Sequence, residues 1–320
     1  MGVRESSTGG ALVSPMESPS TRWAFDAYQR IRSRLPESAS TTVKPELVSS
    51  LAAIVDRFDG FIFDAFGVLN VGNVALPSAL TRIHDLQAMG KHCLVLSNAA
   101  TAPPQRLVRK YRNLGFPIMP DQLISSRMLV SEALARETER IWAVMAPSSA
   151  HAEQLPCRGF VIANQNVQAN REKLDNADAI LMLSAQGWTE ELQQGLVDSL
   201  QRRPRPVWVA NPDLVAPREN GLSLEPGYYA HHLMDATGID TVFFGKPFSN
   251  AFDAAKSRLS HIATSRLLMV GDTLHTDILG GRNAGISTML VTAHGALKGL
   301  DVNACIVASE IVPDFIAPEI

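Results

Sequence analysis

Four sets of polar residues each directly follow a short apolar run of the kind that forms a buried strand. They are Asp64, Ser97 with Asn98, Lys246, and Asp272 with Asp277. A carboxylate in this place can act as a nucleophile or a metal ligand, and a hydroxyl or amide can donate to a phosphate oxygen. An ammonium group there can neutralise a phosphoryl group or orient carboxylates. Together these residue types are the groups that enzymes use for phosphoryl transfer.

Taken singly, most of these residues also have an ordinary structural interpretation. Asp64 could form a turn, Ser97 could cap a helix, and Lys246 could be a solvated loop lysine. The pair Asp272 and Asp277 is more specific, because two carboxylates between a strand end and a helix start can hold a divalent cation beside an anion. Magnesium suits such a site, since it combines a few carboxylates with substrate phosphate oxygens.

The sequence that must position these residues alternates apolar runs with helical stretches. Strands are predicted at 60–63, 92–96, 267–270 and 288–291, and helices at 78–89 and 104–114. This alternation predicts an α/β fold with a mostly parallel sheet covered on both faces. Since ligands bind beyond the carboxyl ends of parallel strands, we expect the four polar sets to converge on one crevice.

The remaining parts of the chain predict further elements. The first twenty residues predict a loose tail, followed by helices at about 22–35 and 45–57. The middle predicts strands at 141–145, 159–163, 179–183 and 207–210 and a helix at 189–201. The apolar run at 241–244 resumes the alternation of strands and helices of the first part. It is expected to be a strand like the one before Asp64.

Length and composition limit the class of protein. With 320 residues and 46% hydrophobic residues, the chain has enough apolar surface for about two domains, which excludes wholesale disorder. A net charge of −3 gives no basic surface for nucleic acid or anionic membranes. No apolar run approaches the roughly 18 residues of a membrane span, and no secretory signal is evident. The three cysteines lack a CxxC pair, which argues against a disulfide framework or a zinc site. We therefore expect a cytoplasmic protein.

At the four polar sets the chain resembles the haloacid dehalogenase (HAD) superfamily, specifically its NagD-like subfamily IIA phosphatases with a C2-type cap. The matching motifs are Asp64-Ala-Phe-Gly-Val68, Ser97-Asn98, Gly245-Lys246-Pro247, Gly271-Asp272 through Asp277, and Asn211-Pro212-Asp213. The resemblance covers about residues 59–293. It implies a Rossmann-like core with a parallel sheet, made of residues 46–140 and 241–320, and an inserted α/β cap at 141–240. Residues 1–45 would be a tail with an extra helix.

The resemblance also implies a magnesium-dependent phosphatase that hydrolyses a small organic phosphomonoester through an aspartyl-phosphate. Asp64 would be the nucleophile, with Ser97 and Lys246 completing the catalytic set. The implied substrate-binding residues are Ser97, Asn98, Lys246 and Asn211. The implied ligands of Mg²⁺ are Asp64, Asp272, Asp277 and the backbone carbonyl of Phe66, although Asp277 could instead orient Lys246. The partner would be a small phosphorylated metabolite, and a homodimer is possible because related proteins often dimerise through the cap.

Phe66 departs from the family pattern. Family phosphatases usually carry an aspartate two residues after the nucleophile, which protonates the leaving alcohol. The aromatic residue leaves two alternatives open: a metal-independent 2-haloacid-type dehalogenase, and a weakly catalytic protein that binds a phosphate ligand. His275 titrates in a suitable range but is expected to be a bystander on an exposed helix start. His231 and His232 are expected to be structural or on the surface, and substrate contact by Arg218 is plausible.

Overall fold

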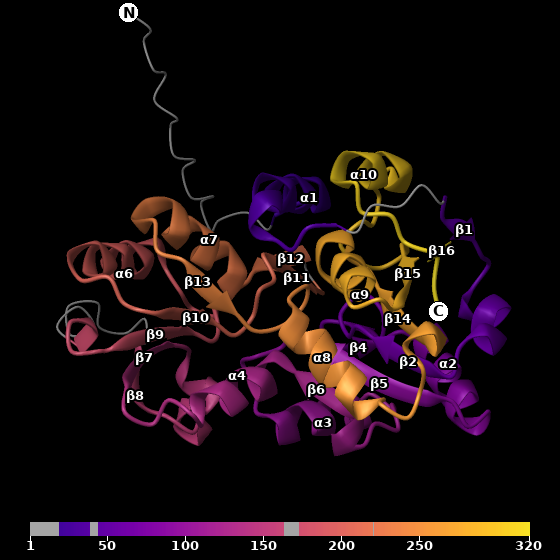
Figure 1. Cartoon of the computed structure of the whole chain (residues 1–320), viewed down its shortest axis with the longest axis horizontal. Coiled ribbons are helices and arrows are strands. Elements are labelled where there is room, and N and C mark those ends of the chain that lie inside the picture. The colour runs from indigo at the N-terminus through magenta and orange to yellow at the C-terminus, as the bar shows by residue number, and fades with distance from the viewer. Residues whose placement is uncertain (1–18, 39–43, 163–172, 220) are drawn as a thin grey trace, which may run out of the picture.

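Two parallel sheets form the framework of the computed structural model, which describes residues 19–38, 44–162, 173–219 and 221–320 (Figure 1). Within these residues the larger sheet has seven strands in the order β1-β16-β15-β14-β2-β5-β6, and neighbouring strands are parallel. The strands are β1 (Glu46–Leu47), β2 (Gly60–Phe63), β5 (His92–Ser97), β6 (Leu123–Ser125), β14 (Leu267–Gly271), β15 (Ser287–Val291) and β16 (Phe315–Ala317). The predicted α/β fold with a parallel sheet is confirmed.

The second sheet has five strands in the order β13-β10-β9-β7-β8 in the described residues, again all parallel. They are β7 (Ile141–Met145), β8 (Arg158–Ile162), β9 (Ala179–Met182), β10 (Val207–Val209) and β13 (Thr241–Phe243). Two short hairpins complete the strands: β3 (Asn70–Val71) with β4 (Val74–Ala75), and β11 (Val215–Arg218) with β12 (Gly221–Leu224). The run at 241–244 was expected to form a strand like the one before Asp64. It instead forms β13, which belongs to the second sheet because it pairs with β10. Residue 163, the end of a predicted strand, lies outside the described residues.

Helices flank both sheets (Figure 1). They are α1 (Thr21–Arg30), α2 (Pro77–Ala88), α3 (Pro104–Asn113), α4 (Ser126–Leu134), α6 (Glu190–Arg202), α7 (Pro226–Thr237), α8 (Ser249–Arg258), α9 (Leu279–Asn283) and α10 (Val302–Ser309). Helices α2 and α3 each start with a proline, whose missing N–H has no helical partner at that position in any case. No helix in the described part of the chain is long and apolar enough to cross a bilayer.

The helix predicted at 45–57 is wrong in its first part, and its second part is a 3₁₀ helix rather than an α-helix. Residues 46–47 form the edge strand β1, in which the N–H of Glu46 donates to Asp314 and that of Val48 to Ile316. The chain then forms a 3₁₀ helix, η2 (Leu51–Arg57), begun by Ser50, whose hydroxyl accepts from the N–H of Ala52. The open edge of β16 recruits this segment, and local sequence does not reveal such a tertiary pairing.

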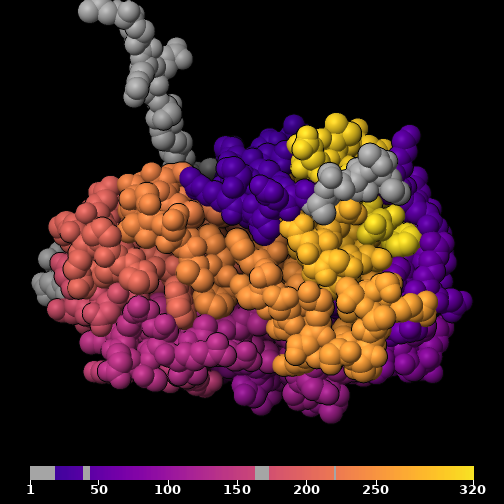
Figure 2. Space-filling view, viewed as in Figure 1, coloured from indigo at the N-terminus to yellow at the C-terminus, as the bar shows by residue number. Residues whose placement is uncertain are grey.

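The larger sheet is buried on both faces. Phe61 and Phe63 of β2 pack into the apolar cluster on one face, and Ile62 between them packs into a cluster on the other. This second cluster continues to Trp142 and Leu181 of the second sheet, so the two sheets share apolar contacts. In Figure 2, helix α1 lies on the surface against orange and yellow segments from later in the chain. The predicted N-terminal helix is therefore packed on the fold.

Candidate active site

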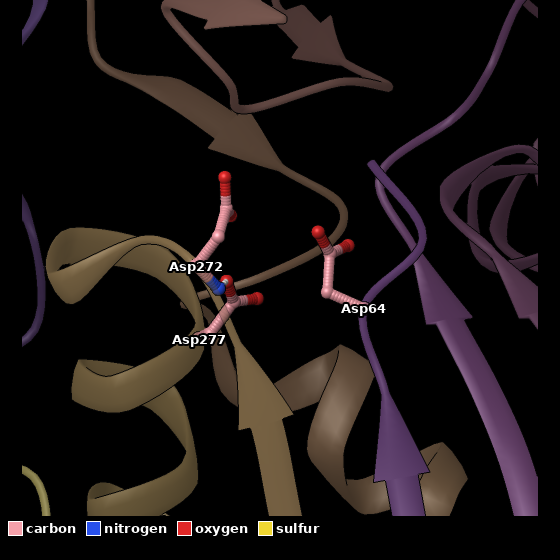
Figure 3. Close-up of side chains that lie close together, drawn as sticks. All are labelled: Asp64, Asp272 and Asp277. Atoms are coloured by element: carbon pink, nitrogen blue, oxygen red, sulfur yellow. Dashed lines mark hydrogen bonds between the residues drawn. The ribbon is translucent and has the colours of Figure 1, made fainter. Parts of the chain in front are cut away.

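Neighbouring strands bring three carboxylates to one edge of the larger sheet. Strands β2 and β14 are paired with Phe63 opposite Val270, and the N–H of Asp64 donates to the carbonyl of Val270 at 2.9 Å. Asp64 follows β2, and Asp272 and Asp277 follow β14. All three side chains are buried, and one oxygen of each lies within 4.8 Å of the others. Figure 3 shows the carboxylates of the two chain segments on either side of a small space.

Hydrogen bonds fix the two later carboxylates. Oδ2 of Asp277 accepts from the backbone N–H groups of Asp272 and Thr273, both at 3.1 Å. Asp272 accepts from the Thr273 hydroxyl and from the N–H of Ala296, both at 2.8 Å. A β-carbon at Gly271 would lie 2.1 Å from that of Asp277, so only glycine permits this close turn. The carboxylates are thus held in place before any ligand binds.

Lys246 lies between two of these carboxylates. Its ammonium group forms an ion pair with Asp64 and lies 2.8 Å from Oδ1 of Asp277, and the side chain is only 2% exposed. Burial alone would lower the pKa of Lys246, but the charges of Asp277 and Asp64 raise it above its usual value. Lys246 is therefore a permanent cation at the site.

The acidic residues carry more negative charge than one lysine balances. Burial raises the pKa of Asp64 to about 6 despite the opposing charge of Lys246. Burial, together with the charges of Asp64 and Asp277, also raises the pKa of Asp272. A divalent cation would relieve this repulsion and lower both pKa values, so the donor set fits such an ion. No hydrogen bond among the described residues uses the carbonyl oxygen of Phe66, which leaves it available as a further ligand.

Asn98 positions Lys246, which arrives from the segment after β13. Oδ1 of Asn98 accepts from the N–H of Lys246 at 2.7 Å, and Nδ2 donates to the carbonyl of Lys246 at 2.9 Å. The second Nδ2 hydrogen goes to Oδ1 of Asp213 at 2.8 Å. Both amide hydrogens are therefore used, and the geometry favours a positioning role over the expected donation to phosphate.

A cavity of about 190 Å³ opens beside these groups. Its lining includes the predicted residues Asp64, Phe66, Ser97, Asn98, Asn211, Lys246 and Asp272. Asp277 is not among the lining residues, but its carboxylate contacts Lys246. Asn211 shapes the wall, because its Nδ2 donates to Glu225 at 3.1 Å and its Oδ1 accepts from the N–H of Asp213 at 3.0 Å. Burial raises the pKa of Asp213 to about 8, so this carboxyl is largely protonated at neutral pH.

Two cations flank the ring of Phe66. Nζ of Lys110 lies 4.6 Å from the ring centroid, and Cζ of Arg218 lies 5.3 Å from it. Both residues line the cavity. Burial, with the nearby charge of Arg218, lowers the pKa of Lys110 to about 8. The sequence had indicated Arg218 as a plausible contact, but Lys110 lies outside every motif and no local signal marks it.

Helix α1 contributes Tyr28 to the cavity, although the resemblance does not reach this helix. The Tyr28 hydroxyl accepts from the N–H of Leu214 at 3.1 Å, and its ring stacks on His275 with centroids 5.0 Å apart. His275 was expected on an exposed helix start, and that is wrong, because α1 covers it and leaves it 1% exposed. Burial lowers its pKa to about 3, so the ring is neutral. His231 is buried against Phe243, as a structural role requires.

Comparisons with known proteins give the family of the chain. A family model of haloacid dehalogenase-like hydrolases matches residues 61–160, and a HAD-hydrolase-like model matches residues 243–320. The chain is 25% identical to the 5'-nucleotidase YutF of Bacillus subtilis, over 73% of this chain and 87% of that protein. It is also 25% identical to acid sugar phosphatase of Staphylococcus aureus, over 73% and 86%.

Solved structures give the same result. A possible sugar phosphatase of the HAD superfamily from Cytophaga hutchinsonii superposes with a TM-score of 0.74 at 28% identity, covering 86% of this chain and 98% of that one. A p-nitrophenyl phosphatase from Archaeoglobus fulgidus, at 20% identity, shares the fold with a TM-score of 0.67 over 82% of this chain and 96% of that one. The chain belongs to the haloacid dehalogenase-like hydrolases. The superfamily expected from the motifs is confirmed.

Proposed function

We propose that the protein is a magnesium-dependent phosphatase that hydrolyses a small organic phosphomonoester through an aspartyl-phosphate on Asp64. The observation that carries this proposal is the buried cluster of Asp64, Asp272 and Asp277, with Lys246 between two of its carboxylates. The names of the relatives, which are sugar phosphatases and a 5'-nucleotidase, support the substrate class. The small cavity suits a metabolite rather than a macromolecule.

Each of these residues has a separate role in the proposed reaction. A carboxylate oxygen of Asp64 attacks the phosphorus, and the bond from phosphorus to the ester oxygen breaks. Lys246 keeps Asp64 ionised and, with the hydroxyl of Ser97, offsets the charge on the phosphoryl oxygens. Water then attacks the phosphorus and releases phosphate and the free carboxylate. Phe66 has no proton to give, so we expect alcohols with a high pKa to leave slowly.

Magnesium fits the carboxylate cluster. Asp64, Asp272 and the backbone carbonyl of Phe66 would hold it, with Asp277 either binding it through water or orienting Lys246. The ion would neutralise charge on the transferring phosphoryl group. A metal-independent dehalogenase has no need of this cluster, which is why we place that function second despite the aromatic residue at position 66. A weakly catalytic phosphate-binding protein would keep the cluster and fail to turn over.

We also propose the domain organisation implied by the resemblance, with one change. Residues 46–140 and the chain after β13 would form the core, and the insertion with the five-stranded sheet would form the cap. Since β13 pairs with β10, the proposed cap extends to residue 243 rather than 240. A cytoplasmic location and a homodimer remain proposals, and size-exclusion chromatography with light scattering would test the dimer.

Hydrolysis of p-nitrophenyl phosphate tests the proposed function. We expect turnover by the wild-type protein with Mg²⁺, and loss of it in EDTA and in Asp64→Asn. Asp56→Asn is a matched control, because the side chain of Asp56 is exposed and does not line the cavity. Undiminished activity in EDTA or in Asp64→Asn would refute the proposal. Turnover of 2-chloropropionate without metal would favour the dehalogenase.

A further inference from the structure

We propose that the cavity binds a second anionic group of the substrate, a carboxylate or a second phosphate, through Lys110 and Arg218. This inference rests on the proposed phosphatase function and names its substrate class. The phosphoryl end of the cavity holds Asp64 and Lys246. The wall formed by Phe66, Lys110 and Arg218 lines the same cavity and contains two cationic side chains.

Lys110 is a partly buried cation without a carboxylate partner among the described residues. Its Nζ donates to the carbonyl of Gly72 at 2.9 Å, which leaves two of its three hydrogens available. Glu219 is an acidic neighbour, but its carboxylate accepts from the backbone N–H of Asn73 at 2.7 Å and forms no ion pair with Lys110. A desolvated ammonium group favours an anionic partner. The substrate can supply it.

Arg218 presents a second cation to the same space. Its Nη2 forms an ion pair with Glu225 at 2.7 Å, and its Nε donates to the Ser223 hydroxyl at 2.9 Å. These bonds fix the guanidinium plane, and Nη1 has no hydrogen bond with the part of the chain that the structure describes. A planar, fixed guanidinium with a free N–H group is well suited to bind an oxyanion.

Phe66 adds no negative charge beside the two cations. An aspartate at this position, as the resemblance leads one to expect, would place a carboxylate beside both Lys110 and Arg218 and partly neutralise them. The phenyl ring holds the two cations by its π face and neutralises neither. Phe66 lies two residues after Asp64, at most about 7 Å away between Cα atoms. A substrate with a few atoms between its phosphoryl and its second anion therefore fits.

A matched pair of substrates tests this inference. The compounds 3-phosphoglycerate and glycerol 3-phosphate share a three-carbon skeleton and differ in a carboxylate against a hydroxymethyl group. We expect kcat/KM with Mg²⁺ to be at least about tenfold higher for 3-phosphoglycerate, since hydrogen bonds to charged groups contribute that much. A second pair, fructose 1,6-bisphosphate and fructose 6-phosphate, tests phosphate as the second anion. A preference in either pair supports the inference and identifies the group, and a preference in neither overturns it.

Variants test whether Phe66, Lys110 and Arg218 cause the preference for the substrate with a second anion. Lys110→Met should lower the preference about tenfold, and Lys110→Arg should retain most of it. Phe66→Asp should also lower it, because the new carboxylate competes for both cations. Lys256→Met, on helix α8 and outside the cavity, makes the same change in net charge. It should not change the ratio of the kcat/KM values for the two substrates of a pair. An unchanged ratio in both Lys110→Met and Arg218→Gln would overturn the inference.

Binding separates this inference from the proposed function. Calorimetric titration of Asp64→Asn with each compound of a pair, in Mg²⁺, gives the ratio of dissociation constants without turnover. If glycerol 3-phosphate is hydrolysed and neither ratio shows a preference, the second-anion site is refuted and the phosphatase stands. If nothing is hydrolysed but the preference in binding is present and Lys110→Met removes it, the phosphatase is refuted and the anion site stands.

Discussion

The side-chain amide of Asn98 forms two hydrogen bonds with the main chain of Lys246, at 2.7 Å to its N–H and at 2.9 Å to its carbonyl. Asn98 follows β5 of the larger sheet, whereas Lys246 follows β13 of the second sheet. One side chain therefore links the segment that follows a strand of the larger sheet to the segment that follows a strand of the second sheet. The position of the Lys246 ammonium group depends on these two hydrogen bonds.

Replacing Asn98 should impair catalysis and stability together. In Asn98→Ala, buried backbone groups of Lys246 lose their partners, which should lower the free energy of unfolding by about 1–3 kcal/mol. Displacement of Lys246 by about 1 Å should lower kcat by up to about 100-fold. Urea unfolding and p-nitrophenyl phosphate turnover measure the two effects. The control is Asn113→Ala, at an exposed site on α3; normal kcat in Asn98→Ala would contradict the positioning role.

Phe66→Asp should restore a proton donor for the leaving group. We expect hydrolysis of alkyl phosphates to rise by about 10²-fold, with a smaller gain for p-nitrophenyl phosphate, whose phenolate leaves without a proton. Phe66→Leu controls for loss of the ring, because leucine adds no acid. The measurement is kcat for both esters in each variant. Equal gains for both esters would show that protonation of the leaving group does not limit turnover.

Tyr28 links helix α1 to the cavity wall. In Tyr28→Phe the buried N–H of Leu214 loses its acceptor, which should lower the free energy of unfolding by about 1–3 kcal/mol, while the ring still stacks on His275. Thermal and urea unfolding test this. Tyr228→Phe, on α7, is a comparison at a less buried tyrosine. A wild-type unfolding curve for Tyr28→Phe would show that the hydrogen bond adds nothing to stability.

His231 should make stability depend on pH. Burial lowers its pKa from 6.5 to about 4, so below pH 6.5 the unfolded chain binds a proton that the folded chain does not. Its contribution is therefore fully present above pH 6.5 and is lost as the pH falls toward 4. Between pH 7.5 and 5 the wild-type protein should lose about 2 kcal/mol more than His231→Leu, as urea unfolding at both values would measure. His84→Leu, on the exposed face of α2, is the control; parallel losses in wild type and His231→Leu would contradict this account.

The sequence predicted the parts of the site in which a polar residue directly follows an apolar strand along the chain. Asp64, Ser97 and Asp272 each end a strand of one parallel sheet, and the apolar runs before them are enough to predict that they meet. The strand before Lys246 was assigned to the wrong sheet, because an apolar run shows that a strand forms but not which strand it pairs with.

Contacts between distant segments could not be predicted in the same way. Lys110 of α3 lines the cavity beside Phe66, and Tyr28 lines it because helix α1 packs against the segment of Leu214. His275 was expected to be exposed for the same reason, since nothing in its neighbourhood shows that α1 covers it. The edge strand β1 likewise exists only through its pairing with β16.

The covalent intermediate on Asp64 is the central claim, and trapping it is the most direct test. The protein is mixed with p-nitrophenyl phosphate and Mg²⁺, quenched in acid at successive times, and digested for mass spectrometry. The account predicts one phosphoryl group on the peptide that contains Asp64, appearing before steady-state turnover and missing in Asp64→Asn. Phosphate on a different residue, or phosphate release with no phosphorylated protein at any quench time, would contradict it.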